Sequence, residues 1–515
     1  MPSVLKRPLI FILLVLPMLP TACAAPLPPT DAPLSQPQAR KELEHLYATL
    51  QASHYDLFAR RSQAEYDALY HQTWEGLGGP THPDALRRAF QRFVAYGNVA
   101  HARIDPPMAE WEAHRASGGR AFPLYLRVVD GRVIVQDDYS GVPGISLGDE
   151  VLSVNGAPAL QWMNRLRTLV SADNDYLAYT QMETQLPMLA WWYGDRALQY
   201  DIAIAKPAGQ RRTFVVPARS RSEFEAAAAA RPSGFELDWN ARTTRITDDG
   251  IGYLRPGPFY DNRPDASDPW DPTAFRTFIG EAFENFIDAG TQAVLIDLRN
   301  NPGGDNSFSD PMIAWFADKP FHFSSQFDIR VSEAAISSNA ERLVAAGNAP
   351  DTTSARLAAA YAGKPLGSRI HFPIPLVHPR NGTRYAKPVY LLINRHSYSN
   401  TVLAAAIAQD YGFATVLGEE TADLASTYGA AEKFKLPTTG LEVSFPKARI
   451  LRPNRDGKPR GVIPDRLIPT PVFATGTDEV LVEALRIVKE DLLDQKAISQ
   501  RVRARGKHQE PPVSP

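Results

Sequence analysis

Two short polar stretches, each directly after an apolar run, carry the residue types that acyl-transfer chemistry needs. The first is the corner at residues 394–400, which contains Ser397 and Ser399. The second is the loop at residues 300–304, which ends in Gly303-Gly304. A serine hydroxyl attacks a carbonyl, and backbone N–H groups at glycines approach the resulting oxyanion closely. Together the two stretches predict a nucleophile and an oxyanion site.

Ser399 has two interpretations. Residues 389–394 read as a buried strand and residues 401–409 as a helix without Gly or Pro, so Ser399 lies where a strand turns into a helix. The first N–H groups of that helix lack partners and carry the positive end of its dipole, which favours a nucleophile there. Ser399 or Asn400 capping the helix is the alternative, and the corner alone favours the cap. The diglycine loop shifts the balance to the nucleophile.

His101 is the side chain that a serine nucleophile needs as a base. It lies in residues 97–105, whose alternation predicts a short strand with one mostly polar face. An imidazole titrates near neutral pH and therefore suits deprotonation of a serine. A single histidine is more often structural, so His101 gains weight only because Ser399 requires a base.

The N-terminus predicts export. Lys6 and Arg7 precede an apolar run at residues 8–19, and small residues follow around Cys23, which is the pattern of a signal peptide over residues 1–23. Cys23 is the single cysteine of the chain, and its context resembles a bacterial lipoprotein cleavage site. Ordinary cleavage after Ala24 is the alternative. We predict a location in the periplasm or cell envelope, with membrane anchoring through a lipid on Cys23, as in an outer-membrane lipoprotein.

Charge and cysteine content exclude several classes of function. The 515 residues include 55 basic and 57 acidic side chains and a net charge of −2, which gives no electrostatic basis for binding nucleic acid. One cysteine permits neither an internal disulfide nor a cysteine-based metal site. The length predicts two to four domains.

The chain divides into segments with different patterns. Beyond the signal peptide, residues 24–37 read as a disordered tether, 38–120 as a helical module and 121–218 as a β unit with a hairpin at Asp130-Gly131. Residues 219–248 read as a connector, in which the Ala-rich stretch 219–233 is either a helical connector or a lid. Residues 249–495 read as a core and 496–515 as a disordered tail. The stretch 142–156, ending in Asn155-Gly156, resembles PDZ domains, with a helix expected at 160–170. Because it lacks their carboxylate loop, peptide binding and a purely structural insert both stay open.

The core predicts a largely parallel, layered α/β fold. Strands alternate with helices between residues 250 and 470, and in such sheets ligands gather at the carboxyl ends of the strands. Ser399 and the diglycine loop both fall at such ends. We expect helices at 274–289, near 310, at 356–362 and at 478–494, and strands at 251–255, 293–299, 412–418, 440–445, 447–451 and 461–465.

Several motifs of the core resemble the S41 family of serine peptidases, the tail-specific or C-terminal processing proteases. They are Asp297-Leu-Arg-Asn-Asn-Pro-Gly-Gly304, Ser397-Tyr-Ser-Asn400, Gly418-Glu-Glu-Thr421 and Gly461-Val-Ile-Pro-Asp465. The resemblance implies a ClpP/crotonase-like layered α/β core with an N-terminal helical module and an inserted PDZ-like β domain. It also implies serine peptidase activity on peptides or proteins without a metal or organic cofactor.

The resemblance assigns roles to single residues. Ser399 matches the family nucleophile, and the N–H of Asn400 with an amide of Gly303 or Gly304 matches the oxyanion hole. Family members of the Ser/Lys type carry a lysine base where this chain has Leu424. A leucine accepts no proton, so the resemblance is closer to the Ser/His branch, similar to the tricorn core protease. In that branch His101 has the position of the base, and Asp456 that of the third, acidic member, with Glu419 and Glu420 as alternatives.

Two other functions are compatible with these residues. One is a catalytically degenerate protein that binds peptides or other ligands on the same scaffold, because Leu424 and the atypical acid depart from the family pattern. The other is an esterase or amidase with the same chemistry on small molecules. Reaction of Ser399 with a fluorophosphonate distinguishes an enzyme from a binding protein.

Overall fold

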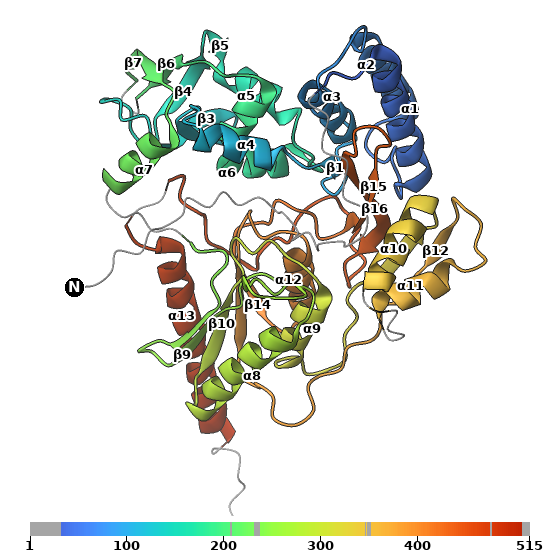
Figure 1. The fold of residues 1–515 in the computed structure, drawn as a ribbon. Helices are drawn as coiled ribbons and strands as arrows, with labels where there is room; N and C mark the ends of the chain where they lie inside the picture. The colour runs from blue at the N-terminus through green and yellow to red at the C-terminus, as the bar shows by residue number, and fades with distance from the viewer. Residues whose placement is uncertain are drawn as a thin grey trace, which may run out of the picture.

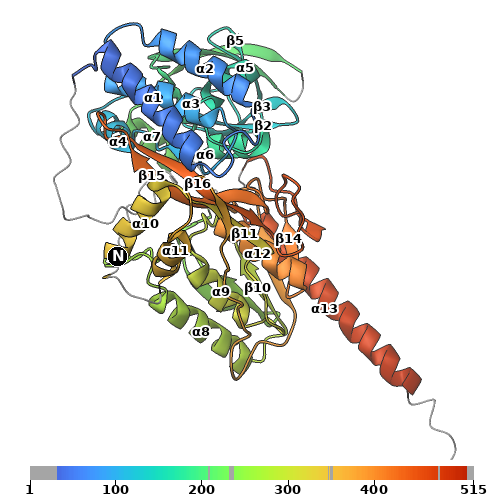
Figure 2. The same cartoon turned by 90° about the vertical axis from the view of Figure 1, so that its right-hand side faces the viewer.

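The computed structural model describes residues 32–206, 209–230, 237–345, 347, 352–473 and 476–506, with side chains as far as residue 497. The predicted signal peptide and Cys23 lie outside the described residues. In Figure 1 the N-terminal helices and the inserted β domain lie over the core, and the last helix, α13 (Glu479–Gly506), projects from the core's far side. Figure 2 shows that projection from a second direction.

The N-terminal module contains the helices that the apolar spacing predicts. They are α1 (Gln36–Ser53), α2 (Gln63–Gly76) and α3 (Pro83–Ala95). Ser35 and Ser62 form capping boxes at the starts of α1 and α2, which satisfies backbone N–H groups there. Leu34 pairs with Thr81, so the described end of the predicted tether is ordered.

The strand predicted around His101 is shorter than expected. Only β1 (Arg103–Ile104) is extended, and it pairs antiparallel with Ser444 and Val443. His101 lies in the turn before it, because Asn98 adopts a positive φ of 50° and reverses the chain.

The inserted domain is a β-sheet with helices against it. Its sheet has the order β2-β3-β4-β6-β7, with β5 on β4. Asp130 (φ 49°) and Gly131 (φ 74°) form the two-residue hairpin turn that their identities predict. The elements are α4 (Met108–Ala116), β2 (Leu124–Val129), β3 (Arg132–Asp138), β4 (Glu150–Val154), β5 (Ala157–Pro158), α5 (Ala159–Arg167), α6 (Asp175–Tyr193), β6 (Gln199–Ala205) and β7 (Arg211–Pro217).

The sequence pattern does not reveal α6, the longest helix of this domain. It contains Pro187 and is apolar on most sides, so neither a clean stripe nor an uninterrupted run marks it. Asn174 caps it by accepting the N–H of Leu177. A helix that is apolar all round must be buried, and α6 lies where the inserted domain meets the core.

The main core sheet is parallel except at one edge. Its order is β17-β14-β13-β10-β9-β8, and only β8 runs antiparallel to its neighbour. The predicted connector contains β8 (Thr243–Ile246), the edge strand of this sheet, and α7 (Arg221–Ala230), whose Phe224 packs in the apolar cluster of the inserted domain. The other strands are β9 (Ile251–Arg255), β10 (Ala293–Asp297), β13 (Val389–Ile393), β14 (Thr415–Gly418) and β17 (Arg466–Leu467).

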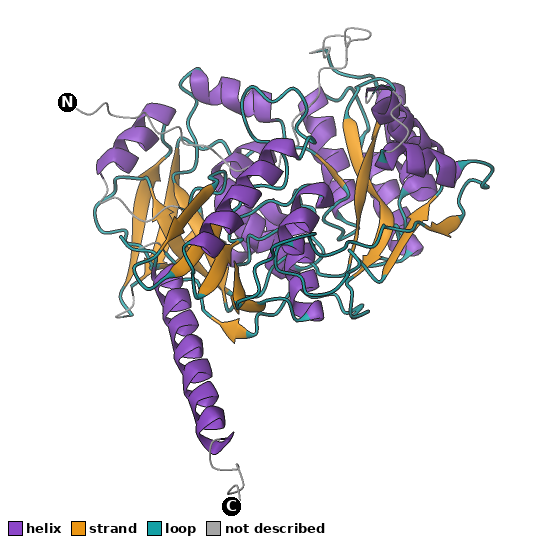
Figure 3. Cartoon of the chain, turned by 90° about the horizontal axis from the view of Figure 1, so that it is seen from below, coloured by secondary structure: helices purple, strands orange, loops and turns teal. Residues whose placement is uncertain are grey.

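Helices cover both faces of this sheet, which explains why its strands read as unbroken apolar runs. Val294 and Ile296 of β10 pack with α8, α9 and α12, whereas Ala293 and Leu295 pack against α13. The covering helices are α8 (Thr273–Asp288), α9 (Asn306–Ala314) and α12 (Asn400–Tyr411). In Figure 3 the strands gather in two regions with helices between them.

A second sheet joins the N-terminal module to the core. Its order is β1-β16-β11-β12, with β15 on β16. The two strands predicted at 440–451 form one strand, β16, that continues through Pro446, and β15 was not predicted because its polar residues hide the pattern. The elements are β11 (Gln326–Arg330), α10 (Glu333–Ala345), α11 (Thr353–Tyr361), β12 (Arg369–His371), β15 (Thr427–Lys435) and β16 (Glu442–Leu451).

Two expectations near the C-terminus are wrong. Residues 461–465 form no strand, since only β17 at Arg466–Leu467 joins the sheet. The helix α13 continues to Gly506, past residue 496 where we predict a disordered tail. Within the described ranges no helix has the length and apolar character to cross a membrane, and no cluster of metal-ligating side chains is present.

Candidate active site

The corner after β13 is fixed by polar contacts to the neighbouring strand end. Ser397 Oγ donates to the carbonyl of Leu298 at 2.9 Å and accepts the N–H of Asn394 at 3.1 Å. The Asn394 amide donates to Asn300 Oδ1 at 2.7 Å and accepts the Asn300 N–H at 3.0 Å. Of the two serines, Ser397 is therefore structural, and it ties the corner to the diglycine loop.

Ser399 has a backbone conformation that is unusual for its residue type. Its φ is 53° and its ψ −123°, outside the regions that side chains other than glycine favour. Although Ser399 occupies the N-cap position of α12, its side chain makes no capping hydrogen bond within the described structure. Such a conformation costs about 1–3 kcal/mol and points to a functional constraint. The geometry therefore favours the nucleophile over the cap.

Gly303 packs directly against Ser399. A Cβ atom at position 303 would lie 2.9 Å from Ser399 Cβ, 2.9 Å from Asn400 N and 2.7 Å from the Tyr398 carbonyl. Gly303 also has a φ of 88°, which favours glycine. Both constraints hold the diglycine loop at backbone contact with the Ser399 corner, as the two strand ends predict.

The amides beside Ser399 differ in their availability. The Gly303 N–H donates to Asn301 Oδ1 at 2.9 Å. Among the described residues, the N–H groups of Gly304 and Asn400 have no acceptor. These two free amides therefore match the chemistry of an oxyanion hole better than the Gly303 amide.

The His101 ring lies against Tyr398, the residue before Ser399. The two rings stack with centroids 5.7 Å apart, and His101 is only 8% exposed. Burial, with the nearby charge of Arg103, lowers the pKa of His101 to about 4 despite a hydrogen bond to the Tyr428 backbone. Its Nδ1 has no hydrogen-bond partner in the described structure. At neutral pH the imidazole is uncharged, as a general base must be.

Two buried aspartates that the sequence analysis missed adjoin these residues. Asp423 Oδ2 accepts the Ser399 N–H at 2.6 Å, and Asp173 Oδ2 accepts the Ala100 N–H at 3.1 Å. Burial raises the pKa of Asp423 to about 7, with a contribution from the charge of Asp173, and raises that of Asp173 to about 6. Asp423 immediately precedes Leu424, whereas Asp173 resembles an ordinary residue before a helix and gives no signal in the sequence.

The acidic residues considered from the sequence lie elsewhere. Asp456 accepts the Lys458 N–H at 3.0 Å and pairs with Arg460 at 2.9 Å near the surface, and these contacts lower its pKa. Glu419 pairs with Arg395 at 2.8 Å, and Glu420 accepts the Gly461 N–H at 3.1 Å. None of these carboxylates contacts His101 in the part of the chain that the structure describes. The acidic role of Asp456 stays a prediction.

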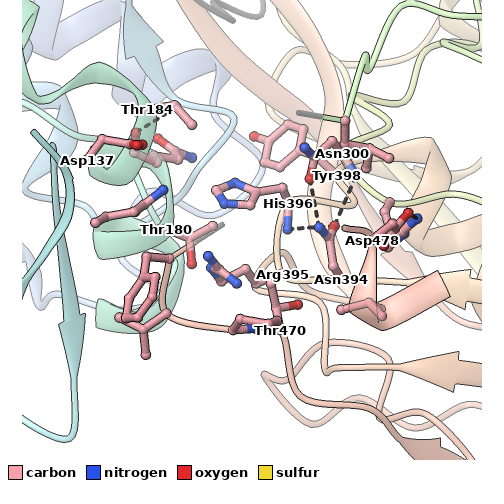
Figure 4. Close-up of a pocket in the computed structure, with 18 of the residues that line it drawn as sticks. Asp137, Thr180, Thr184, Asn300, Asn394, Arg395, His396, Tyr398, Thr470 and Asp478 are labelled. Carbon is pink, nitrogen blue, oxygen red and sulfur yellow. Dashed lines mark hydrogen bonds and ion pairs between the residues drawn. The ribbon is translucent and has the colours of Figure 1, made fainter. Parts of the chain in front are cut away.

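A cavity of about 280 Å³ opens beside the corner. In Figure 4 Asp137, Thr180 and Thr184 of the inserted domain lie on one side, Asn300, Tyr398 and Asp478 of the core lie on the other, and Arg395 and His396 lie between them. Pro302 and Tyr398, the neighbours of Gly303 and Ser399, are part of the lining. The cavity thus lies at the domain junction and borders the corner through the neighbours of Gly303 and Ser399.

The comparisons agree with the motifs. Residues 251–468 match the model of peptidase family S41. A protein of Chlamydia muridarum is 27% identical over 160 residues, 26% of this chain and 27% of that protein. One of Chlamydia trachomatis serovar D is 24% identical over 200 residues, 33% of each. The chain thus spans about a third or less of these relatives' length.

Solved structures share the fold. Mature CPAF has a TM-score of 0.59 at 17% identity, covering 85% of this chain and 93% of that one. Mature CPAF complexed with lactacystin has a TM-score of 0.60 at 17% identity, covering 90% and 99%. Their likeness confirms the layered α/β core. The family match includes the Ser399 corner and the diglycine loop, so this part of the chain is similar to peptidase family S41.

Proposed function

We propose that this protein is an exported serine endopeptidase in which Ser399 attacks the peptide carbonyl and His101 is the general base. The observation that carries the proposal is the strained, uncapped Ser399 in contact with Gly303. The stacking of His101 on Tyr398 supports the choice of base. The similarity to peptidase family S41 supports peptide or protein substrates, and the specificity and the endopeptidase mode also belong to the proposal.

In the proposed reaction each of these groups has one role. As Ser399 Oγ bonds to the carbonyl carbon, its proton passes to the neutral His101 ring, and the carbonyl oxygen becomes an oxyanion. The N–H groups of Asn400 and of Gly303 or Gly304 face this charge, with the Gly304 amide available and the Gly303 amide engaged. The imidazolium then protonates the leaving amine, and water hydrolyses the acyl-enzyme by the reverse sequence. Asp456 is the acid that the resemblance proposes for His101.

Export completes the proposal. The signal-like residues 1–23 direct the chain to the periplasm or cell envelope, and lipidation of Cys23 anchors it to a membrane. Metabolic labelling with palmitate tests the anchor: the proposal expects label on the wild type and none on Cys23→Ala. Label on the variant, or an unlabelled wild type, contradicts lipidation.

A fluorophosphonate probe tests the enzymatic proposal. We expect a covalent adduct that peptide mapping places on Ser399 and not on the hydrogen-bonded Ser397. Ser399→Ala should lose the adduct while it keeps the melting temperature of the wild type. A folded wild type that does not react would contradict the proposal and favour a degenerate binding protein.

A further inference from the structure

Two buried carboxylates beside the proposed catalytic residues have no role in the mechanism so far. Asp423 follows β14, is fully buried and accepts the N–H groups of Ser399 and Leu424. Asp173 precedes α6 in the inserted domain, and its Oδ1 has no hydrogen-bond partner in the described structure. Buried carboxylates normally pair with cations, so two such groups together need an explanation.

The two carboxylates hold the two halves of the proposed site in the same way. Asp423 accepts the N–H of the proposed nucleophile, Ser399, at 2.6 Å. Asp173 accepts the N–H of Ala100, the residue before the proposed base, at 3.1 Å. Tyr398 connects the two halves, because its ring stacks on His101 and its hydroxyl feels the charges of both aspartates.

The Ser399 backbone requires an acceptor of this kind. A serine at φ 53° relaxes toward a favoured conformation unless its surroundings over-determine it. Gly303 leaves room for this conformation, and Asp423 is the polar group that binds its N–H. A charged acceptor binds an N–H about twice as strongly as a neutral one.

We propose that Asp173 and Asp423 are a pair of positioning residues that hold His101 and Ser399 in reacting geometry, and that uptake of a proton by the pair at mildly acidic pH releases Ser399. The proposal rests on the proposed function of Ser399 and His101. It links catalysis to docking of the inserted domain, because Asp173 belongs to that domain and Asp423 to the core.

The surroundings of the pair supply little compensating positive charge. Arg60 lies 3.9 Å from Asp173 Oδ1 and is partly exposed, and Arg103 is engaged with Asp105 at 2.7 Å. Tyr398 interacts with the charges of both aspartates, and the neutral His101 ring stacks on Tyr398. Burial, against so little compensating charge, raises the pKa of Asp423 to about 7 and that of Asp173 to about 6. The pair therefore takes up its first proton as the pH falls below about 7.

The rate of fluorophosphonate labelling as a function of pH tests the pair without knowledge of the natural substrate. For the wild type we expect the second-order rate constant to fall below about pH 7, near the pKa of Asp423. His101 alone would give a fall only near pH 4. Asp423→Asn should label about tenfold more slowly at pH 8, because a neutral acceptor binds the Ser399 N–H less well. The pH below which its labelling rate falls should be lower than in the wild type by about one unit or more, because the repulsion between the two carboxylates is removed.

Matched variants complete the experiment. Asp173→Asn should also react more slowly, and its labelling rate should begin to fall at a lower pH than that of the wild type. Asp149→Asn, which removes a buried carboxylate that binds Ser146 and Lys206 in the inserted domain, should keep the wild-type profile. Wild-type profiles in both Asp423→Asn and Asp173→Asn would overturn the proposal, and so would a wild-type labelling rate that falls only near pH 4. A wild type without any Ser399 adduct would instead overturn the proposed function itself.

Discussion

Two groups of buried acids at the junction of the inserted domain and the core differ in their partners. Glu183 of α6 accepts Arg395 Nε at 2.8 Å and lies 3.2 Å from His396 Nε2. Burial would raise its pKa, but the charge of Arg395 and the contact with His396 outweigh burial and lower it to about 2. Asp173 has only the partly exposed Arg60 at 3.9 Å, and Asp423 has no ion pair within the described structure, so burial raises both pKa values. Partners, and not burial alone, therefore decide whether a buried acid stabilises the fold or titrates near neutral pH.

The first test removes the paired acid. Glu183→Gln should lower the free energy of unfolding by about 3 kcal/mol, since it leaves the buried Arg395 without half of its compensation. Glu284→Gln is the matched control, because its ion pair with Arg380 is largely exposed and contributes about 0–1 kcal/mol. Urea denaturation measures both. Equal losses in the free energy of unfolding for the two variants would show that the contacts of Glu183 with Arg395 and His396 do not stabilise the domain junction.

The second test places a methyl group in the other region, at Gly303 beside Ser399. Gly303→Ala should destabilise by about 2–3 kcal/mol and slow labelling of Ser399 about a hundredfold, because the methyl group meets backbone at 2.7–2.9 Å. Gly290→Ala has a similar positive φ of 69° but open space around it, so it measures the backbone term alone, about 1 kcal/mol. If the two variants behave alike, the contact between Gly303 and Ser399 is not essential.

The third test separates the two groups by pH. The raised pKa of Asp423 adds stability below about pH 4, and this contribution is lost as the pH rises through about 7. The lowered pKa of Glu183 has the opposite sign, since its contribution is present above about pH 4.5 and lost as the pH falls toward 2. Asp423→Asn should therefore raise the free energy of unfolding at pH 8 by about 1–2 kcal/mol. If Asp423→Asn is less stable than the wild type at pH 8, the conclusion that the Asp423 carboxylate lacks a compensating cation is contradicted.

The smallest expected effect belongs to Asp456. Its ion pair with Arg460 is exposed, so Asp456→Asn should change the free energy of unfolding by less than about 1 kcal/mol. Thermal denaturation measures this, with Asp423→Asn as the buried counterpart. A larger loss of stability would mean that Asp456 has a buried partner. The labelling rate of the same folded variant decides its acidic role, which a large decrease supports.

The sequence predicts those parts of the site that regular local patterns encode. The apolar run before Ser399 and the diglycine motif identify the two strand ends, because buried parallel strands have a distinctive composition. The helix α6 escapes detection because it is apolar all round and contains Pro187. Asp173 and Asp423 escape because their roles arise from tertiary burial of two residues that are 250 positions apart in the chain. Local spacing carries no information on such a contact.

The rate at which a fluorophosphonate acylates the nucleophile tests the central claim most directly, in a comparison of the wild type with His101→Ala at pH 8. General-base assistance contributes about 10²–10⁴-fold, so we expect the variant to label Ser399 more slowly by that factor at an unchanged melting temperature. Labelling of Ser399 in His101→Ala at the rate of the wild type would contradict the account.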